Sequence, residues 1–369
     1  MVENIKLFSV GDIFLGEHPV TLGHGVNSIV RKKGANFLLE KIKEHLKDGD
    51  IVCGNLEGII SPKKKEETGI KSAIFWGEPE CAEALRSAGL NCLFLANNHT
   101  AQHGIDALKR SCQLLDKNNI KWTGFNPTEP TLPLSAIFNV KGVQVGILAY
   151  CETQQYNLDT PILPIINIES IKKDINNLRK NCDIVIISLH WGDEFTEIPS
   201  PEQIKLGRLI IDAGADLILG HHSHVLQGIE RYKHGIIVYS LGSFIKDLWQ
   251  RNMRESIILK CDLTRQGIKN IEYIPIYIND DYQPEILFSN KGDRILSKLK
   301  NLSEAIENED LSDYQQKVSQ YKTNVCNLLR KDRNDTYIHY LLNLYRYPLL
   351  MLFQNIYVIL KRRILRKNF

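Results

Sequence analysis

The chain has 369 residues, of which 43% are hydrophobic and 24% are charged, and its net charge is only +3. This length and composition are typical of a soluble globular protein that buries a full core, in one large α/β domain or in two ordinary ones. The small net charge, with no basic stripe interleaved with aromatic residues, excludes a dedicated nucleic-acid-binding protein.

The sequence also indicates a reduced, cytoplasmic setting. Residues 5–10 are too short for the apolar core of a signal peptide and follow no basic segment. No apolar run reaches the roughly 18–20 residues of a membrane-spanning helix. The eight cysteines form no CxxC pair, and several lie in strand-like runs where a free thiol packs as a small hydrophobe.

Strand-like and helix-like stretches alternate up to about residue 280, which favours an α/β architecture. Expected strands lie at 5–10, 51–53, 90–95, 120–124, 136–140, 143–150, 183–189, 215–219, 235–240, 256–263 and 271–278. Expected helices lie at 37–46, 79–88, 105–115, 168–178 and 201–213. The nearly uninterrupted apolar run at 183–189 is typical of a strand that is covered on both faces of its sheet.

Three histidines directly follow the strand expected at 215–219. They are His221, His222 and His224. Neutral imidazole is a common metal ligand, and a His-x-His pair at a strand end can direct two nitrogens at one ion. The alternative is a polar loop with hydrogen-bonded histidines.

Other strand ends carry ligand-type side chains as well. Asp12 follows the first expected strand, Glu57 the second, Asn98 and His99 the third, and His190 the strand at 183–189. Each feature alone has a structural explanation, such as ordinary turn chemistry for a Gly-Asp pair. Because strand ends converge at one edge in such sheets, the set predicts a site for one or two divalent ions. Carboxylate, amide and imidazole donors suit Mn, Fe or Zn.

In order along the chain, these motifs resemble the CapA family of capsule and poly-γ-glutamate biosynthesis proteins, within the calcineurin-like metallophosphatase superfamily. The matching stretches are 11–16, 54–57, 95–99, 190–192, 213–216, 220–227 and 239–244. The resemblance implies a four-layer fold, with two packed mixed sheets flanked by helices. It also implies a dinuclear-type metal centre at the sheet edge.

The resemblance further assigns residue roles. It implies that His99 donates a proton and that the metal ligands are Asp12, Glu57, Asn98, His190, His222 and His224. Glu57, or with less support Asn55, stands at the bridging-carboxylate motif. We expect substrate contacts from Asn55, Asn97, Trp191 and His221.

The sequence departs from the superfamily pattern at one ligand. Phe14 stands two places after Asp12, where histidine is usual, so one metal position loses a donor. Ser223 and Ser243 replace the proline and asparagine common in the family, and neither change removes a ligand.

The leading hypothesis is therefore a metal-dependent hydrolase of phosphoester or amide bonds that acts in capsule or poly-γ-glutamate metabolism. One alternative is a non-catalytic accessory protein that binds an anionic polymer or a synthase subunit. Another is a phosphoesterase with no link to capsule. Phe14 favours the accessory protein, whereas the Asn98-His99 pair favours an enzyme.

Beyond about residue 280 the alternation stops. We therefore expect a metallophosphatase-like domain over 1–280 and a helical extension over 281–369. Residues 337–367 combine an apolar, tyrosine-rich stretch with a basic cluster, and Pro348 interrupts any helix there. This pattern predicts contact with the cytoplasmic face of a membrane, or packing on the domain or on a synthase partner.

Overall fold

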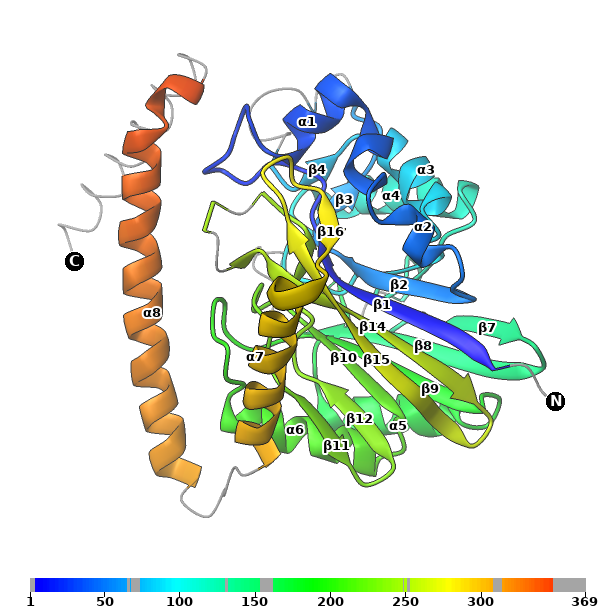
Figure 1. Ribbon diagram of the computed structural model, residues 1–369. Coiled ribbons are helices and arrows are strands. Elements are labelled where there is room, and N and C mark those ends of the chain that lie inside the picture. Colours follow the sequence, from blue (N-terminus) through cyan, green and yellow to red (C-terminus); the bar gives the residue numbers. More distant parts are fainter. Residues whose placement is uncertain are drawn as a thin grey trace.

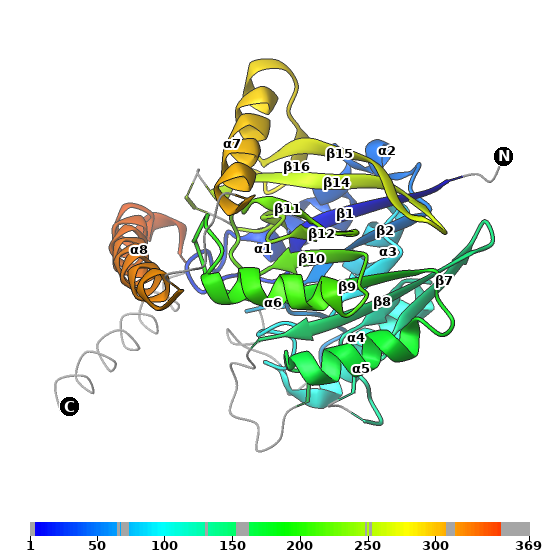
Figure 2. The same cartoon turned by 90° about the horizontal axis from the view of Figure 1, so that it is seen from below.

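The computed structural model describes residues 4–64, 67, 74–129, 132–152, 162–247, 249–250, 253–307 and 314–347. Two mixed β-sheets pack face to face, and helices cover their outer faces (Figures 1 and 2). The α/β class and the four-layer arrangement expected from the sequence are confirmed.

The first sheet has the strand order β16-β15-β14-β1-β2-β5-β6, and β13 also pairs with β1. Its strands are β1 (Ile5–Ile13), β2 (Ile51–Leu56), β5 (Cys92–Phe94), β6 (Lys121–Thr123), β13 (Ser243–Ile245), β14 (Glu255–Thr264), β15 (Gly267–Ile278) and β16 (Pro284–Ile286). Strands β1, β2, β5 and β6 are parallel, and β14 to β16 are antiparallel to their neighbours.

The second sheet has the order β11-β12-β10-β9-β8-β7. Its strands are β7 (Ala136–Val140), β8 (Val143–Cys151), β9 (Ile184–His190), β10 (Leu217–His221), β11 (Ile229–Tyr232) and β12 (Gly235–Val238). Strands β8, β9, β10 and β12 run parallel, so their carboxyl ends meet at one edge. A separate small pair joins β3 (Ile59–Ile60) to β4 (Trp76–Gly77).

The side chains of β9 alternate between two cores. Ile184 and Ile186 belong to the core between the sheets, while Val185 and Ile187 pack in a second core under the outer helices. Both faces are therefore buried, as the apolar run predicted.

The helices form the outer layers. They are α1 (Val26–Lys33), η1 (Ala35–Leu39), α2 (Lys43–Leu46), α3 (Glu80–Ser87), α4 (Gly104–Lys117), α5 (Ile168–Leu178), α6 (Pro201–Asp212), α7 (Ser289–Glu307), α8 (Tyr314–Leu342) and η4 (Leu344–Arg346). Helices α1, α3 and α4 share a core with the first sheet, and α5 and α6 cover the second. Helix α7 packs against β11 and β15.

Two local expectations were wrong. The helix expected at 37–46 is instead the 3₁₀ turn η1 followed by the short helix α2, because packing against α1 and α3 prevails over helical spacing. Asp12 was expected beyond the first strand, but it lies within β1, which is extended by its pairing with β13.

Helix α8 runs along one side of the molecule (Figures 1 and 2). Its carboxyl-terminal half is attached to the body by hydrogen bonds from the Tyr340 hydroxyl to the Pro19 carbonyl oxygen, 2.8 Å, and from Gln250 to Asp332, 2.5 Å. Within the described ranges, no helix is long and apolar enough to cross a membrane. Most of the stretch 337–367 lies outside the described residues, and the division at residue 280 stays a prediction.

Candidate metal centre

Asp12 lies near the end of β1, between two parallel neighbours. Its Cα pairs with that of Asn55 in β2 and with that of Ser243 in β13. The preceding Gly11 permits this close approach, because a Cβ there would lie 2.0 Å from the Gly242 carbonyl oxygen. The Asp12 side chain is fully buried, so the surrounding strands fix its direction.

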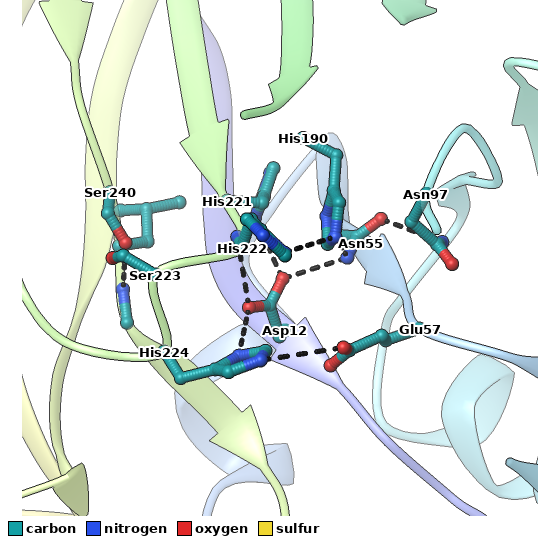
Figure 3. A network of polar contacts seen from close by, with 12 residues as sticks. Asp12, Asn55, Glu57, Asn97, His190, His221, His222, Ser223, His224 and Ser240 are labelled. Atoms are coloured by element: carbon teal, nitrogen blue, oxygen red, sulfur yellow. Dashed lines mark hydrogen bonds and ion pairs between the residues drawn. The ribbon is translucent and has the colours of Figure 1, made fainter. Parts of the chain in front are cut away.

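The second sheet brings the histidines to the same place. His190 ends β9 and His221 ends β10, with their Cα atoms in register. The next turn carries His222 and His224, with φ angles of 95° and 59°. Residues with a Cβ rarely adopt this left-handed conformation, and residues held in it tend to cluster at functional sites. Both residues contact Asp12 Oδ2, His224 through its ring at 3.0 Å and His222 through its backbone N–H at 3.3 Å (Figure 3).

Asp12, Glu57 and His224 form a cluster that we call the carboxylate position. His224 Nδ1 lies 3.0 Å from Asp12 Oδ2, and His224 Nε2 lies 3.5 Å from Glu57 Oε1. One ligand atom from each residue falls within 4.8 Å of the others. All three side chains are buried, so water does not shield their charges.

Lys246 reaches the carboxylate position from the residue after β13. Its Nζ lies 2.7 Å from Glu57 Oε2 and 2.8 Å from His224 Nε2. The lysine side chain is only 7% exposed and the Glu57 side chain 0%, so this is a buried ion pair.

Asn98, His190 and His222 form a second cluster, which we call the imidazole position. His190 Nε2 lies 2.9 Å from Asn98 Oδ1 and 3.0 Å from His222 Nδ1. Asn55 links the two positions, since its amide donates to Asp12 Oδ1 at 2.8 Å and lies 3.3 Å from His190 Nδ1. The two sheets therefore contribute to one continuous centre.

The residues of the imidazole position fit a divalent ion. The 2.9 and 3.0 Å separations match the spacing of roughly 3 Å between neighbouring ligands around an ion with bonds of about 2.1 Å. Glu194 lies close enough to His222 and His224 to add a carboxylate oxygen on the solvent side. Such mixed oxygen and nitrogen donors suit borderline ions such as Mn, Fe or Zn.

The two buried carboxyl groups are ionised at neutral pH. Burial alone would raise the pKa of Asp12, but hydrogen bonds from His221 and His224 hold it well below its ordinary value. Burial also opposes ionisation of Glu57, whose pKa is nevertheless lowered, chiefly by the positive charge of Lys246.

The histidines of the imidazole position are neutral at the same pH. Burial lowers the pKa of His190 well below 6.5, and the neighbouring His222 lowers it further. Burial likewise lowers the pKa of His222. The centre therefore presents carboxylates and neutral imidazoles, the forms that bind metal ions.

His99 lies beside the centre, with its ring stacked on Phe75 at a centroid distance of 3.5 Å. The side-chain oxygen Oε1 of Gln102 lies 3.1 Å from His99 Nδ1, so Nδ1 carries a hydrogen. His99 Nε2 lies 3.8 Å from Glu57 Oε1, an oxygen that accepts no hydrogen bond from any residue the structure describes. Burial, with a contribution from Lys246, lowers the pKa of His99 to about 4.

Two cavities adjoin the centre. One of about 640 Å³ is lined by His99, His224, Lys246 and Trp249, among others. The other, of about 660 Å³, is lined by His190 and His222 and by residues 321, 322, 325 and 326 of α8. The first cavity is therefore reached from the carboxylate position through His224, and the second from the imidazole position through His190 and His222.

Comparison with known proteins identifies the family. Residues 6–248 match the model of the bacterial capsule synthesis protein PGA_cap. The chain belongs to this family. The family prediction made from the motifs is therefore confirmed.

Relatives of this PGA_cap chain include two proteins from Bacillus. It is 28% identical to the capsule biosynthesis protein CapA of Bacillus anthracis, over 80% of this chain and 73% of that protein. It is 29% identical to the PGA biosynthesis protein CapA of Bacillus subtilis, over 73% and 71%. Among solved structures, a putative 5'-nucleotidase from Staphylococcus aureus superposes with a TM-score of 0.47 at 15% identity, covering 81% of this chain and 58% of that one.

The structure brings all six predicted metal ligands of this family member into the two positions, next to the predicted proton donor His99. Asn55, Asn97 and His221, three of the four residues expected to contact substrate, are buried around Asp12 (Figure 3). Asn97 donates to the Leu56 carbonyl oxygen at 2.7 Å. The fourth, Trp191, packs against Tyr239 in the outer core and donates to its carbonyl oxygen at 3.1 Å. Trp191 therefore lines neither of the two cavities beside the centre.

Sequence reasoning missed Lys246 and Glu194. Lys246 directly follows strand β13, which overlaps the family motif at 239–244. Its place at a strand end could have indicated a role in the centre. Glu194 stands four residues after His190, in a loop whose direction the sequence did not indicate.

Proposed function

We propose that this chain is a metal-dependent hydrolase that cleaves a phosphoester or amide bond during synthesis or processing of a poly-γ-glutamate-type capsule polymer. The proposal depends on one observation above all. Six donor residues from five chain segments meet in one buried centre with His99 beside it. The names of the Bacillus relatives support the link to capsule polymer.

A divalent ion bound at the imidazole position would polarise the scissile group and activate water for attack. Asn98, His190 and His222 would hold this ion. Asn55 donates to Asp12 at 2.8 Å and so fixes this carboxylate of the adjoining carboxylate position.

His99 would protonate the leaving group. Since Nδ1 already carries a hydrogen held by Gln102, Nε2 is the atom that gains and then donates the proton. Glu57 Oε1, 3.8 Å away, favours the protonated ring. An anionic substrate in the first cavity would favour protonation further, because it adds negative charge beside a buried imidazole.

An accessory role without catalysis is the second candidate. It is supported by Phe14, whose buried apolar ring stands where the superfamily has a ligand. A probable polyglutamine synthesis accessory protein of Mycobacterium tuberculosis is 26% identical over 54% of this chain and 56% of that protein. In this role the same centre would bind the carboxylates of an anionic polymer.

We also propose that the carboxyl-terminal region attaches the protein to a synthase subunit or to the cytoplasmic surface of a membrane. Near the end of the described chain, Ile338, Leu341 and Leu342 expose 54%, 69% and 71% of their surface. Apolar side chains exposed together favour contact with a partner or with lipid.

Metal analysis and a hydrolysis assay of the purified full chain test the enzyme hypothesis. We expect bound divalent metal, and Mn-dependent cleavage of a generic phosphodiester or of a γ-glutamyl amide. His99→Ala should lower turnover by about 10²–10⁴-fold while metal content is unchanged. His45→Ala, which changes an exposed histidine of α2, is the matched control. An inactive protein that still binds the polymer would instead favour the accessory role.

A further inference from the structure

The carboxylate position already contains a cation that belongs to the chain. Lys246 Nζ lies 2.7 Å from Glu57 Oε2, 2.8 Å from His224 Nε2 and 3.2 Å from His224 Nδ1. It therefore contacts two of the three residues whose ligand atoms converge there.

Lys246 also uses the lone pair that His224 would need to bind a metal through Nε2. An ammonium group can only donate, so His224 Nε2 accepts from it and His224 Nδ1 carries the hydrogen. That hydrogen is donated to Asp12 Oδ2 at 3.0 Å (Figure 3). The result is a continuous chain of hydrogen bonds from Lys246 through His224 to Asp12.

Phe14 leaves the carboxylate position short of a donor. Its ring is fully buried, and its centroid lies 5.7 Å from Lys246 Nζ. An aromatic face attracts an ammonium group but has no lone pair to offer a metal. The surroundings thus suit a lysine better than a divalent ion.

The charges favour the same arrangement. Of the two carboxylates in the carboxylate position, Glu57 already pairs with the Lys246 ammonium group at 2.7 Å. A single divalent ion at the imidazole position is then balanced by Asp12 and by Glu194, whose carboxylate lies close to His222 and His224. Two divalent ions beside a buried ammonium would leave a large excess of positive charge in a site with little water, which is unfavourable.

We propose that the centre binds one divalent ion, held by Asn98, His190 and His222, and that Lys246 replaces the second ion of a dinuclear site. Lys246 lines the first cavity with His99, so its ammonium group stabilises negative charge on a substrate phosphoryl or carbonyl oxygen there. This inference rests on the proposed function, because it gives the number of metal ions that the proposed hydrolase binds and the position of the ion.

Metal stoichiometry tests the inference without depending on turnover. The full chain is loaded with Mn²⁺, dialysed, and measured by elemental analysis and by calorimetric titration. We expect one ion per chain and the electron paramagnetic resonance spectrum of isolated Mn²⁺, not that of an exchange-coupled pair. The wild-type measurement alone is informative, so the test does not depend on whether a variant folds.

Variants then test the part played by Lys246. The double variant Phe14→His/Lys246→Met restores a donor and removes the ammonium, and it should bind a second ion with an exchange-coupled spectrum. Lys260→Met should still bind one, since Lys260 forms an ion pair of the same 2.7 Å length with Glu272 on the surface.

Each outcome distinguishes the two hypotheses. Two ions bound to the wild type would overturn the role of Lys246 and leave the hydrolase proposal standing. One ion in both the wild type and the double variant would also overturn that role, because something other than Lys246 would then limit binding. No bound ion at all would overturn both.

Discussion

The carboxylate and imidazole positions adjoin each other, but they differ in how their polar groups are satisfied. In the carboxylate position, Lys246 contacts Glu57 and His224 with an internal positive charge. In the imidazole position, His190 and His222 face each other at 3.0 Å beside the Asn98 oxygen. Among the described residues, no lysine or arginine forms an ion pair or hydrogen bond with these three side chains.

This difference in charged contacts indicates that the carboxylate and imidazole positions have different functions. Lys246 gives the carboxylate position a cation of its own. The imidazole position instead directs two imidazole nitrogens and an amide oxygen toward one another, a donor set that a divalent ion can bind. We therefore expect changes in the carboxylate position to alter stability, and changes in the imidazole position to alter metal affinity.

The largest expected effect is on stability. Lys246→Met leaves Glu57 as an uncompensated buried charge, so the metal-free protein should lose about 3–5 kcal/mol of unfolding free energy. Urea unfolding in the presence of EDTA measures this. Lys260→Met, which breaks an exposed pair of the same length, should cost at most about 1 kcal/mol.

Removing both charges sharpens the same prediction. In Glu57→Gln/Lys246→Met no unpaired charge is buried, so much of the stability should return. A double variant as unstable as Lys246→Met alone would show that packing of the lysine chain, rather than its charge, stabilises this region.

The next effect is on metal affinity. His222→Ala removes a donor of the imidazole position, so the dissociation constant for Mn²⁺ should rise by more than about 100-fold, beyond the 10–100-fold typical of losing a supporting contact. Unfolding free energy in EDTA should change little, because His222 is partly exposed. Calorimetric titration measures the affinity, and an unchanged constant would move the ion to the carboxylate position.

A smaller effect concerns pH. The pKa of His190 and of His99 is lower in the folded protein than its ordinary value of 6.5, so the unfolded chain takes up protons first as pH falls. Their contribution to stability is complete above about pH 6.5 and is lost below it, at up to about 1.4 kcal/mol per pH unit for each histidine.

Unfolding in EDTA between pH 7 and pH 5 measures this slope. His190→Gln should reduce it, whereas Glu57→Gln should not, because the pKa of Glu57 is lowered from 4.5 and this carboxyl stays ionised throughout that range. Equal slopes in the wild type and in His190→Gln would mean that His190 does not titrate with folding.

The sequence predicted the imidazole position better than the carboxylate position. Asn98, His190 and His222 follow strands that are recognisable by their apolar runs, and parallel strands bring their carboxyl ends to one edge. Local sequence patterns alone therefore predicted that these three side chains lie at the same edge of the sheets. The strand ends, together with the family resemblance, led us to predict six metal ligands and His99 as the proton donor.

Lys246 and Trp191 show where local patterns fail. A lone lysine after a short strand normally lies in water, and only the fold reveals that its partner is Glu57, 189 positions away. Trp191 follows His190 directly, but successive side chains point to opposite faces of a strand. Trp191 therefore enters the outer core, whereas His190 points into the centre.

The smallest predicted effect concerns His99, which belongs to neither position but lies next to Glu57. Gln102→Leu removes the contact that holds His99 Nδ1 at 3.1 Å, so the ring loses its fixed orientation and turnover should fall about tenfold, the lower end for a supporting contact. Mn²⁺ affinity and stoichiometry should stay unchanged, because Gln102 touches no donor of the imidazole position among the described contacts. Parallel measurements of turnover and of Mn²⁺ titration check this. A loss of affinity would mean that His99 helps to hold the ion. His99 would then belong to the imidazole position, and the division of the centre into two positions would have to change accordingly.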